Sequence, residues 1–138
     1  MAVEYELKSS VPSAVDFCRL RAAAGMTPRS EAAAEAGLPG TLHGVLALVE
    51  GRVIGMGRII GDGGLVYHIC DMAVEPDFQG RGIGRAIMAG LMAHLREIIP
   101  AEAYVNLLAD GPARFLYGEF GFELTEPETR GMAVWLRP

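Results

Sequence analysis

The sequence predicts an α+β fold in which a mixed, mostly antiparallel sheet of about seven strands packs with about four helices. Apolar runs separated by tight turns predict three consecutive antiparallel strands between His43 and Val74. An apolar face that repeats every four residues predicts a long helix beginning near Ile83. The strand that follows this helix returns by a parallel, right-handed crossover.

Composition excludes several classes of function. The 138-residue chain is expected to form one domain, residues 1–138, with a 51% hydrophobic content that argues against disorder. A formal net charge of -5 without a basic run argues against nucleic acid as a partner. No stretch approaches the roughly 18 apolar residues of a membrane span, and Glu4 and Glu6 are atypical of a signal peptide. Cys18 and Cys70 lack metal-site spacing, so we expect no metal and a reduced, cytoplasmic protein.

The first forty residues predict a strand and two short helices. Val3–Ser9 alternates apolar and polar residues, as a half-buried strand does. Ser13, with Asp16 three residues later, predicts the N-cap of the first helix as a variant of the capping box. An alanine-rich second helix is expected to follow Ser30 and to end near Gly37.

Tight turns separate the three central strands. His43–Val49 and Arg52–Ile60 are predicted to pair through a hairpin turn at Glu50-Gly51. A glycine-rich turn then leads to the third strand, which begins at Leu65 and is stopped by Pro76.

The last third of the chain predicts alternating short elements. Tyr104–Leu108 is apolar enough for a buried strand, and Ala113–Glu119 is expected to form a helix. Two short strands around Phe122–Leu124 and Met132–Leu136 complete the predicted sheet.

A glycine-rich turn, Gln79-Gly80-Arg81-Gly82-Ile83-Gly84, joins the third strand to the long helix. The first N–H groups of a helix lack intrahelical partners, and its dipole favours negative charge there. Glycines allow a ligand to approach the backbone closely. We therefore expect a phosphate-bearing ligand, although the turn matches neither a P-loop nor a Rossmann fingerprint. The alternative is an ordinary strand–turn–helix corner.

Two motifs resemble one protein family. With the preceding Met72-Ala73-Val74-Glu75-Pro76, the turn resembles the acyl-CoA pyrophosphate loop of the GNAT superfamily of N-acetyltransferases. Tyr117–Phe122, of the form Tyr-x-x-x-Gly-Phe, is similar to a second feature of that family. The order of predicted elements also matches the GNAT fold. The resemblance implies an acetyl-CoA-dependent N-acetyltransferase whose sheet splays at the strand carrying Met72, with the acceptor bound at the first two helices.

The resemblance places acetyl-CoA on this strand and turn. The backbone of Met72, Ala73 and Val74 would pair with the pantetheine arm as if it were another strand. The N–H of Met72 or of Ala73 would also stabilise the oxyanion of the reaction. Asn106, on the next strand, is expected either to contact the cofactor or to cap its strand. The pyrophosphate is assigned to the backbone amides and the Arg81 side chain within Gln79, Gly80, Arg81, Gly82, Ile83 and Gly84.

Two side chains are candidates for proton transfer. Tyr117 would protonate the departing thiolate as a general acid, the alternative being a packed core aromatic. His68 is a candidate base because the ordinary histidine pKa of about 6.5 suits neutral pH, the alternative being a structural residue. Asp71, expected on the opposite side of the strand unless a bulge shifts the alternation, and an ordered water chain compete for this role. Cys70 as a covalent acyl carrier is the weaker variant.

The function therefore expected is transfer of an acetyl group from acetyl-CoA to a primary amine by direct attack in a ternary complex. A non-catalytic acyl-CoA-binding or regulatory domain is the alternative. The acceptor would be a small-molecule or a protein amine, and the acidic balance favours a cationic one. A hydroxyl acceptor, a longer acyl chain and a homodimer are left open.

Overall fold

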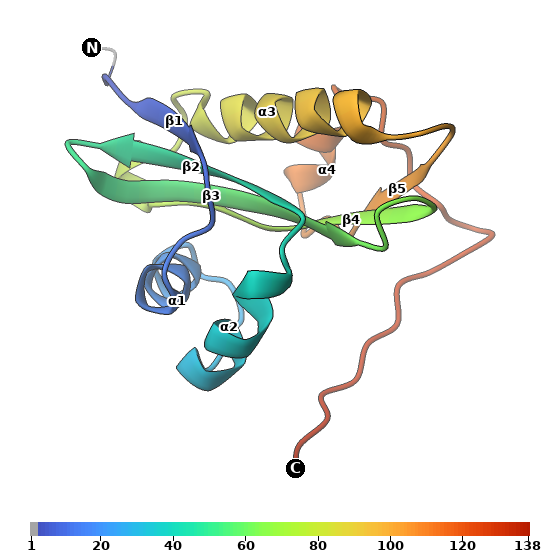
Figure 1. Cartoon of the computed structure of the whole chain (residues 1–138), viewed down its shortest axis with the longest axis horizontal. Coiled ribbons are helices and arrows are strands. Elements are labelled where there is room, and N and C mark those ends of the chain that lie inside the picture. Colours follow the sequence, from blue (N-terminus) through green and yellow to red (C-terminus); the bar gives the residue numbers. More distant parts are fainter. Residues whose placement is uncertain (1–2) are drawn as a thin grey trace. The chain divides into compact units, whose positions relative to one another are not determined.

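Five strands form a single sheet in the computed structural model, which describes residues 3–138 (Figure 1). The strands follow one another in the order β1-β2-β3-β4-β5. Each neighbouring pair is antiparallel except β4 and β5, which are parallel. The predicted α+β class with a mixed, mostly antiparallel sheet is therefore confirmed. The bounds are β1 (Glu6–Ser9), β2 (His43–Val49), β3 (Arg52–Gly61), β4 (Val66–Val74) and β5 (Tyr104–Leu107).

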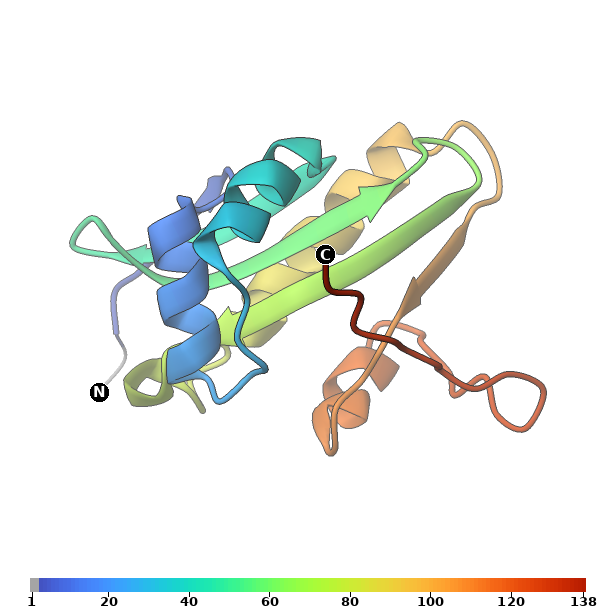
Figure 2. The ribbon, with the colours of Figure 1, turned by 90° about the horizontal axis from the view of Figure 1, so that it is seen from below.

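The chain forms two compact units. The first ends at Leu107 and contains the whole sheet, whereas the second comprises Leu108–Pro138. In the first unit, α1 and α2 cover one face of the sheet and α3 covers the other (Figures 1 and 2). The prediction that residues 1–138 are one domain stays a prediction. The helices are α1 (Ala14–Ala23), α2 (Glu31–Gly37), α3 (Ile83–Ile98) and α4 (Ala113–Gly118), with 3₁₀ turns η1 (Leu38–Gly40) and η2 (Pro76–Phe78).

The two short helices begin at the residues that the sequence predicts. The Ser13 hydroxyl accepts a hydrogen bond from the Asp16 N–H at 3.1 Å, and the Ser30 hydroxyl accepts one from the Ala33 N–H at 3.1 Å. Each hydroxyl satisfies an N–H group that has no partner inside its helix. The Asp16 carboxylate pairs with Arg19 at 3.1 Å, so it forms an ion pair along the helix.

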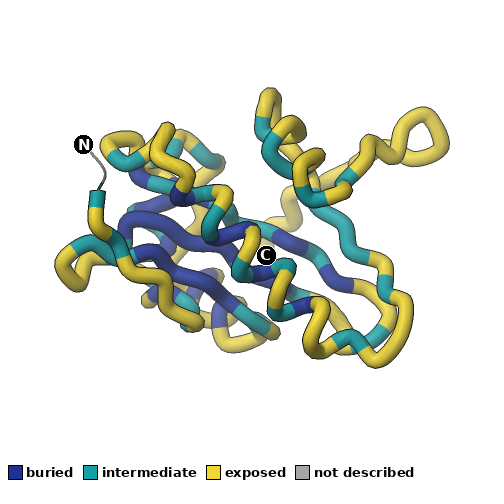
Figure 3. Tube along the Cα trace, turned by 90° about the horizontal axis from the view of Figure 1, so that it is seen from above, coloured by how far each residue is buried: buried dark blue, intermediate teal, exposed yellow. Residues whose placement is uncertain are grey.

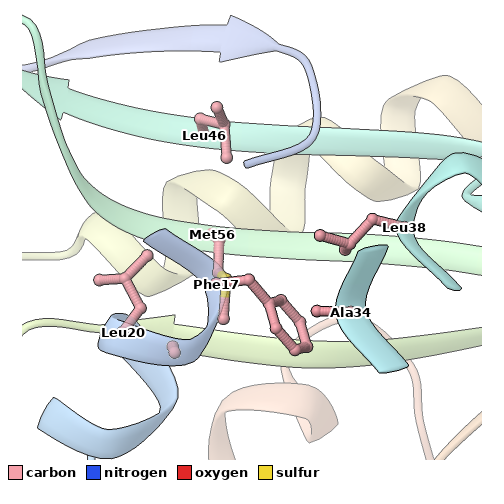
Figure 4. Packing of buried hydrophobic residues seen from close by; sticks show 7 residues of the cluster. Phe17, Leu20, Ala34, Leu38, Leu46 and Met56 are labelled. Atoms are coloured by element: carbon pink, nitrogen blue, oxygen red, sulfur yellow. The ribbon is translucent and has the colours of Figure 1, made fainter. Parts of the chain in front are cut away.

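The core of the first unit lies on both faces of the sheet. Figure 3 shows burial concentrated along the central strands and the side of α3 that faces them. The α3 side chains Ile83, Ile87, Leu91 and Leu95 are all buried, which confirms the predicted apolar stripe. On the opposite face, one cluster joins both short helices to the strands (Figure 4); its members are Phe17, Leu20, Ala34, Leu38, Leu46, Met56 and Ala73.

The prediction of about seven strands is wrong, because neither of the two expected C-terminal strands forms. Phe122–Leu124 and Met132–Leu136 have no strand conformation, and Met132 and Leu136 are 95% and 88% exposed. The backbone hydrogen bonds here are local, such as that from the Thr129 N–H to the Thr125 carbonyl at 3.1 Å. Apolar alternation produces a strand only where a neighbouring strand satisfies its backbone groups.

The outer strands also differ from expectation. The first strand was predicted at Val3–Ser9 as half-buried, but it begins at Glu6 and all four of its residues are exposed. It is an edge strand that pairs with β2 alone, which explains its exposure. At the other edge, β5 ends at Leu107, and Tyr104 is 57% exposed, so the prediction of a buried strand is wrong as well.

Candidate active site

A β-bulge interrupts β4 at Asp71. Arg58 of β3 is opposite Cys70, but Met56 is already opposite Ala73, so two β4 residues stand against one residue of β3. Asp71 takes a φ of 57°, in the left-handed region that non-glycine residues rarely adopt. The extra residue shifts the alternation of side chains along the strand.

The bulge decides which β4 side chains share a face. His68, Cys70 and Asp71 all line one pocket beneath α1 and α2. Simple alternation, which would place Asp71 on the side opposite His68, therefore fails, and the alternative that a bulge shifts the alternation is confirmed. Alternation holds only in an uninterrupted strand, and the extra residue turns the Asp71 side chain to the pocket side.

Beyond the bulge, β4 loses its partner on one side. β5 pairs only with Val66–Ile69, so within the first unit no strand adjoins residues 70–74 on that edge. This agrees with the splay that the family resemblance implies. The Glu75 N–H donates to the Ile54 carbonyl of β3 at 2.8 Å, and a trans peptide therefore points the Val74 carbonyl to the open edge. The Gln79 side chain donates to this carbonyl at 2.8 Å.

The glycine-rich turn between β4 and α3 is open. Gly80 and Gly82 have φ values of 77° and 79°, which favour glycine. A Cβ added to either glycine would meet no described heavy atom within 4 Å. Gly82 is the N-cap of α3 and provides no side-chain cap, so the first N–H groups of the helix remain available to a ligand. The turn is thus suited to an anion.

Glu75 fixes the end of β4 immediately before this turn. Its side chain is only 9% exposed and forms ion pairs with Arg19 of α1 and with Arg52, whose Nη2 lies 2.8 Å from Glu75 Oε1. Arg19 also donates to the Val53 carbonyl at 2.8 Å. These contacts tie the strand exit to α1 and β3. Sequence reasoning missed them, although a carboxylate directly after an apolar strand was the available signal.

The pocket on this face has a volume of about 330 Å³. Asp71 lies at its base, where Oδ1 accepts from Arg21 Nη1 and Oδ2 accepts from Arg58 Nε, each at 2.6 Å. Sequence reasoning missed both arginines as site residues; an arginine within an apolar strand, as at Arg58, was the available signal. The lining comprises Phe17, Arg29, Ala33, Ala34, Gly37, Leu38, Arg58, Ile60, His68, Cys70 and Asp71.

His68 is oriented by Asn106. The two residues are opposite each other in the β4–β5 ladder, and His68 Nδ1 lies 2.5 Å from Asn106 Oδ1. An amide oxygen only accepts, so with this orientation a neutral ring carries its proton on Nδ1 and leaves a lone pair on Nε2. The alternative that Asn106 caps its strand is wrong, because its side chain contacts the histidine. Whether Asn106 binds cofactor stays a prediction.

Two other groups predicted to take part in the chemistry remain protonated at neutral pH. Burial, followed by the neighbouring Asp71 carboxylate, raises the pKa of the Cys70 thiol to about 12, which disfavours a thiolate that carries the acyl group. In the second unit, burial and then Asp110 raise the pKa of the Tyr117 phenol. The Tyr117 ring packs edge-on against Phe122, with 6.5 Å between centroids.

An open-edged mixed sheet followed by a glycine turn at a helix N-terminus agrees with the fold that the resemblance to the GNAT superfamily implies. Residues 21–138 match the family model described as the acetyltransferase (GNAT) domain. The chain therefore belongs to the GNAT acetyltransferase family.

Several named proteins are similar over part of their length. A rice protein, serotonin N-acetyltransferase 2, chloroplastic (Oryza sativa subsp. japonica), is 35% identical over 85 residues, which are 62% of this chain and 42% of that protein. A soybean protein, histone acetyltransferase TAP1 (Glycine max), is 33% identical over 65% of this chain and 38% of its own length. The chain thus spans about two fifths of these relatives.

Solved structures share the fold over nearly the whole chain. A Staphylococcus aureus protein of unknown function, described as a probable acetyltransferase, is 42% identical with a TM-score of 0.93, covering 96% of this chain and 100% of that one. A GNAT family protein from Streptococcus pneumoniae has a TM-score of 0.76 at 24% identity, over 97% and 98% of the two chains, and so shows the fold alone.

Residues 3–138 lack two further kinds of feature. No described helix is long and apolar enough to cross a membrane. The same residues contain no group of three or more His, Cys, Asp or Glu side chains placed to hold a metal ion.

Replacing Asp71 with Asn should destabilise the fold. Asparagine tolerates the left-handed backbone of the bulge but leaves two nearly buried guanidinium groups without a counter-charge. We expect Asp71→Asn to lower the free energy of unfolding by about 3 kcal/mol or more, measured by urea denaturation. Asp77→Asn, at an exposed position, is the control. A loss below about 1 kcal/mol would show that the ion pairs contribute no more than surface pairs do.

Proposed function

We propose that the protein is an acetyl-CoA-dependent N-acetyltransferase that moves the acetyl group to a primary amine by direct attack in a ternary complex. The observation that carries this proposal is the open edge of β4, which leads directly into the glycine turn at the start of α3. The open edge of β4 offers backbone groups to an extended, amide-containing ligand, and the glycine turn offers backbone amides to phosphate. Acyl-CoA contains an amide-bearing pantetheine arm followed by a pyrophosphate.

The residues present fit this substrate. The backbone of Met72, Ala73 and Val74 would pair with the amides of the pantetheine arm. The Val74 carbonyl already accepts a hydrogen bond from an amide, that of Gln79, which a pantetheine N–H would replace. The N–H of Met72 or Ala73 would hold the oxyanion. The pyrophosphate would lie on the turn formed by Gln79, Gly80, Arg81, Gly82, Ile83 and Gly84.

His68 is the base that we propose for the acceptor. A protonated amine must lose one proton before its nitrogen attacks, and Nε2 of His68 carries the lone pair in the tautomer that Asn106 favours. Asp71 is a poorer base because both of its oxygens accept from arginines. The amine would occupy the pocket that His68 lines.

Tyr117 is the general acid that we propose. As the new C–N bond forms and the C–S bond breaks, the departing sulfur takes a proton from the phenol. The raised pKa of Tyr117 keeps that proton on the oxygen at neutral pH. The Tyr-x-x-x-Gly-Phe pattern, together with membership of the family, supports this role.

We further propose that residues 1–138 act as one catalytic domain, that the protein is cytoplasmic, that it requires no metal and that it binds no nucleic acid. A homodimer is compatible with this function. The acceptor is taken as an amine of either a small molecule or a protein.

Replacing Gly82 with Ala should weaken CoA binding. A left-handed backbone disfavours alanine, and the new methyl group would stand where the pyrophosphate approaches. We expect at least about a tenfold rise in the dissociation constant for CoA, measured by calorimetry, since one lost charge-assisted hydrogen bond has this effect. Gly63→Ala is the matched control, because Gly63 has a φ of 82° with equally open surroundings and lies in the β3–β4 turn. If Gly82→Ala and Gly63→Ala bind CoA with equal affinity, the glycine turn is not part of the CoA-binding site.

Replacing His68 with Gln should slow turnover. Glutamine retains a polar contact to Asn106 but removes the base, and loss of a positioned base costs about 10²–10⁴-fold in rate. The release of CoA at saturating acetyl-CoA measures kcat, and binding of CoA should remain unchanged. His94→Gln, on the opposite face of the sheet, is the control. If the kcat of His68→Gln stays within twofold of wild type, His68 is not the base, and an ordered water chain would take the proton instead.

Replacing Tyr117 with Phe separates an enzyme from a binding domain. The ring remains and the acid is lost, so kcat should fall at least about tenfold while the KM for acetyl-CoA changes little. A variant as active as the wild type would make Tyr117 a packing residue. A wild-type protein that binds CoA tightly but releases none from acetyl-CoA with any amine would favour the non-catalytic alternative.

A further inference from the structure

The pocket is lined by more cationic than anionic side chains, although the chain as a whole has a negative net charge. Among the described residues that line it, Asp71 is the one carboxylate, whereas Arg29 and Arg58 are both cationic. Arg21 stands directly behind Asp71 and is itself buried. Two guanidinium groups therefore bind the one carboxylate and a third lines the same pocket, although the chain has a formal net charge of -5.

Asp71 is already shared between two of these cations. Each of its oxygens accepts from a different arginine at 2.6 Å, and Arg58 additionally donates to Thr41 Oγ1 at 2.9 Å. Arg29 comes from the loop between α1 and α2 and lines the same pocket. Burial and then the charge of Arg21 lower the pKa of Arg29, whereas the charge of Asp71 raises it. A bound anion beside Arg29 would favour the charged guanidinium in the same direction as Asp71 does.

The rest of the lining is apolar. Phe17, Leu38 and Ile60 contribute hydrocarbon, and Ala33 and Ala34 of α2 narrow one wall. A volume of about 330 Å³ lies at the small end of the range of small-molecule sites. His68 lines the same space, so the base and the excess positive charge meet in one small cavity.

We infer that the acceptor is a small primary amine with an apolar body and a carboxylate or phosphate group, which is held by the positive side of this pocket at Arg29. This inference rests on the proposed function and names its acceptor class. It revises the expectation, drawn from overall composition, of a cationic acceptor, because the energy between two charges falls with the distance between them and the nearest charges therefore dominate.

Matched pairs of amines test the inference. Phenylalanine and 2-phenylethylamine differ by a carboxylate, and 2-aminoethyl phosphate and ethanolamine differ by a phosphate. Binding of each is measured by calorimetry with CoA present, and CoA release is measured with acetyl-CoA. In at least one pair, we expect the amine that carries the carboxylate or phosphate to bind about tenfold or more tightly than the partner without it. A difference in the first pair indicates a carboxylate site, and a difference in the second pair indicates a phosphate site. If neither acid-bearing amine binds more tightly than its partner, the inference is wrong.

Variants of Arg29 connect that preference to the pocket. Arg29→Gln should raise the KM of the preferred anionic amine about ten- to a hundredfold, with kcat and the KM for acetyl-CoA nearly unchanged. Arg29→Lys should restore part of the affinity. Arg96→Gln removes the same charge from an exposed position on α3 and should have no effect. An anion preference that survives Arg29→Gln would overturn the assignment.

Failure of the inference and failure of the proposed function give different results. If CoA binds and amines are acetylated without an anion preference, only the acceptor class is wrong. If CoA does not bind, or binds and is never released from acetyl-CoA, the proposed function fails first.

Discussion

The double ion pair of Asp71 is the interaction on which the candidate site depends. One carboxylate, 10% exposed, accepts from Arg21 of α1 and Arg58 of β3. It thereby holds a non-glycine residue in a left-handed conformation at the bulge. Moving this carboxylate away from its two arginines would be costly, because nearly buried charged groups would then be left without a counter-charge.

Two consequences of the bulge meet at the site. The shifted alternation brings the side chains of His68 and Asp71 to the same pocket. Beyond the bulge, no described strand of the first unit adjoins β4 on its β5 side, and the Val74 carbonyl there accepts the exchangeable hydrogen bond of the Gln79 side chain. The β-bulge at Asp71 therefore separates the part of β4 proposed to bind acetyl-CoA from the part that lines the pocket proposed for the amine. The two substrates would then approach each other along one strand.

Local signals made most of the first unit predictable. The caps at Ser13 and Ser30, the turn at Glu50-Gly51 and the stripe of α3 each depend on residues close in sequence, and all are present. The two predicted C-terminal strands failed because a strand needs a distant partner that alternation does not specify.

The candidate site was predictable only where it is local. The glycine turn lies in consecutive residues, and its open conformation follows from them. The contacts of Asp71 with Arg21 and of His68 with Asn106 join residues 50 and 38 positions apart. No local sequence pattern indicates such pairs. The set of charged side chains that meet at the pocket is therefore known only from the structure. A net charge summed over the chain favours a cationic acceptor, whereas the side chains that line this cavity favour the acid-bearing amine that we propose.

Hydrogen exchange along β4 tests the central claim most directly, namely that the open part of this strand pairs with the pantetheine arm. Amide exchange is followed by NMR with and without CoA. The account predicts that CoA slows exchange at the Val74 amide and at the amides of residues 80–84, while those of Val66–Ile69, which lie in the part of β4 that pairs with β5, change little. CoA binding that leaves Val74 and the turn unprotected would contradict it.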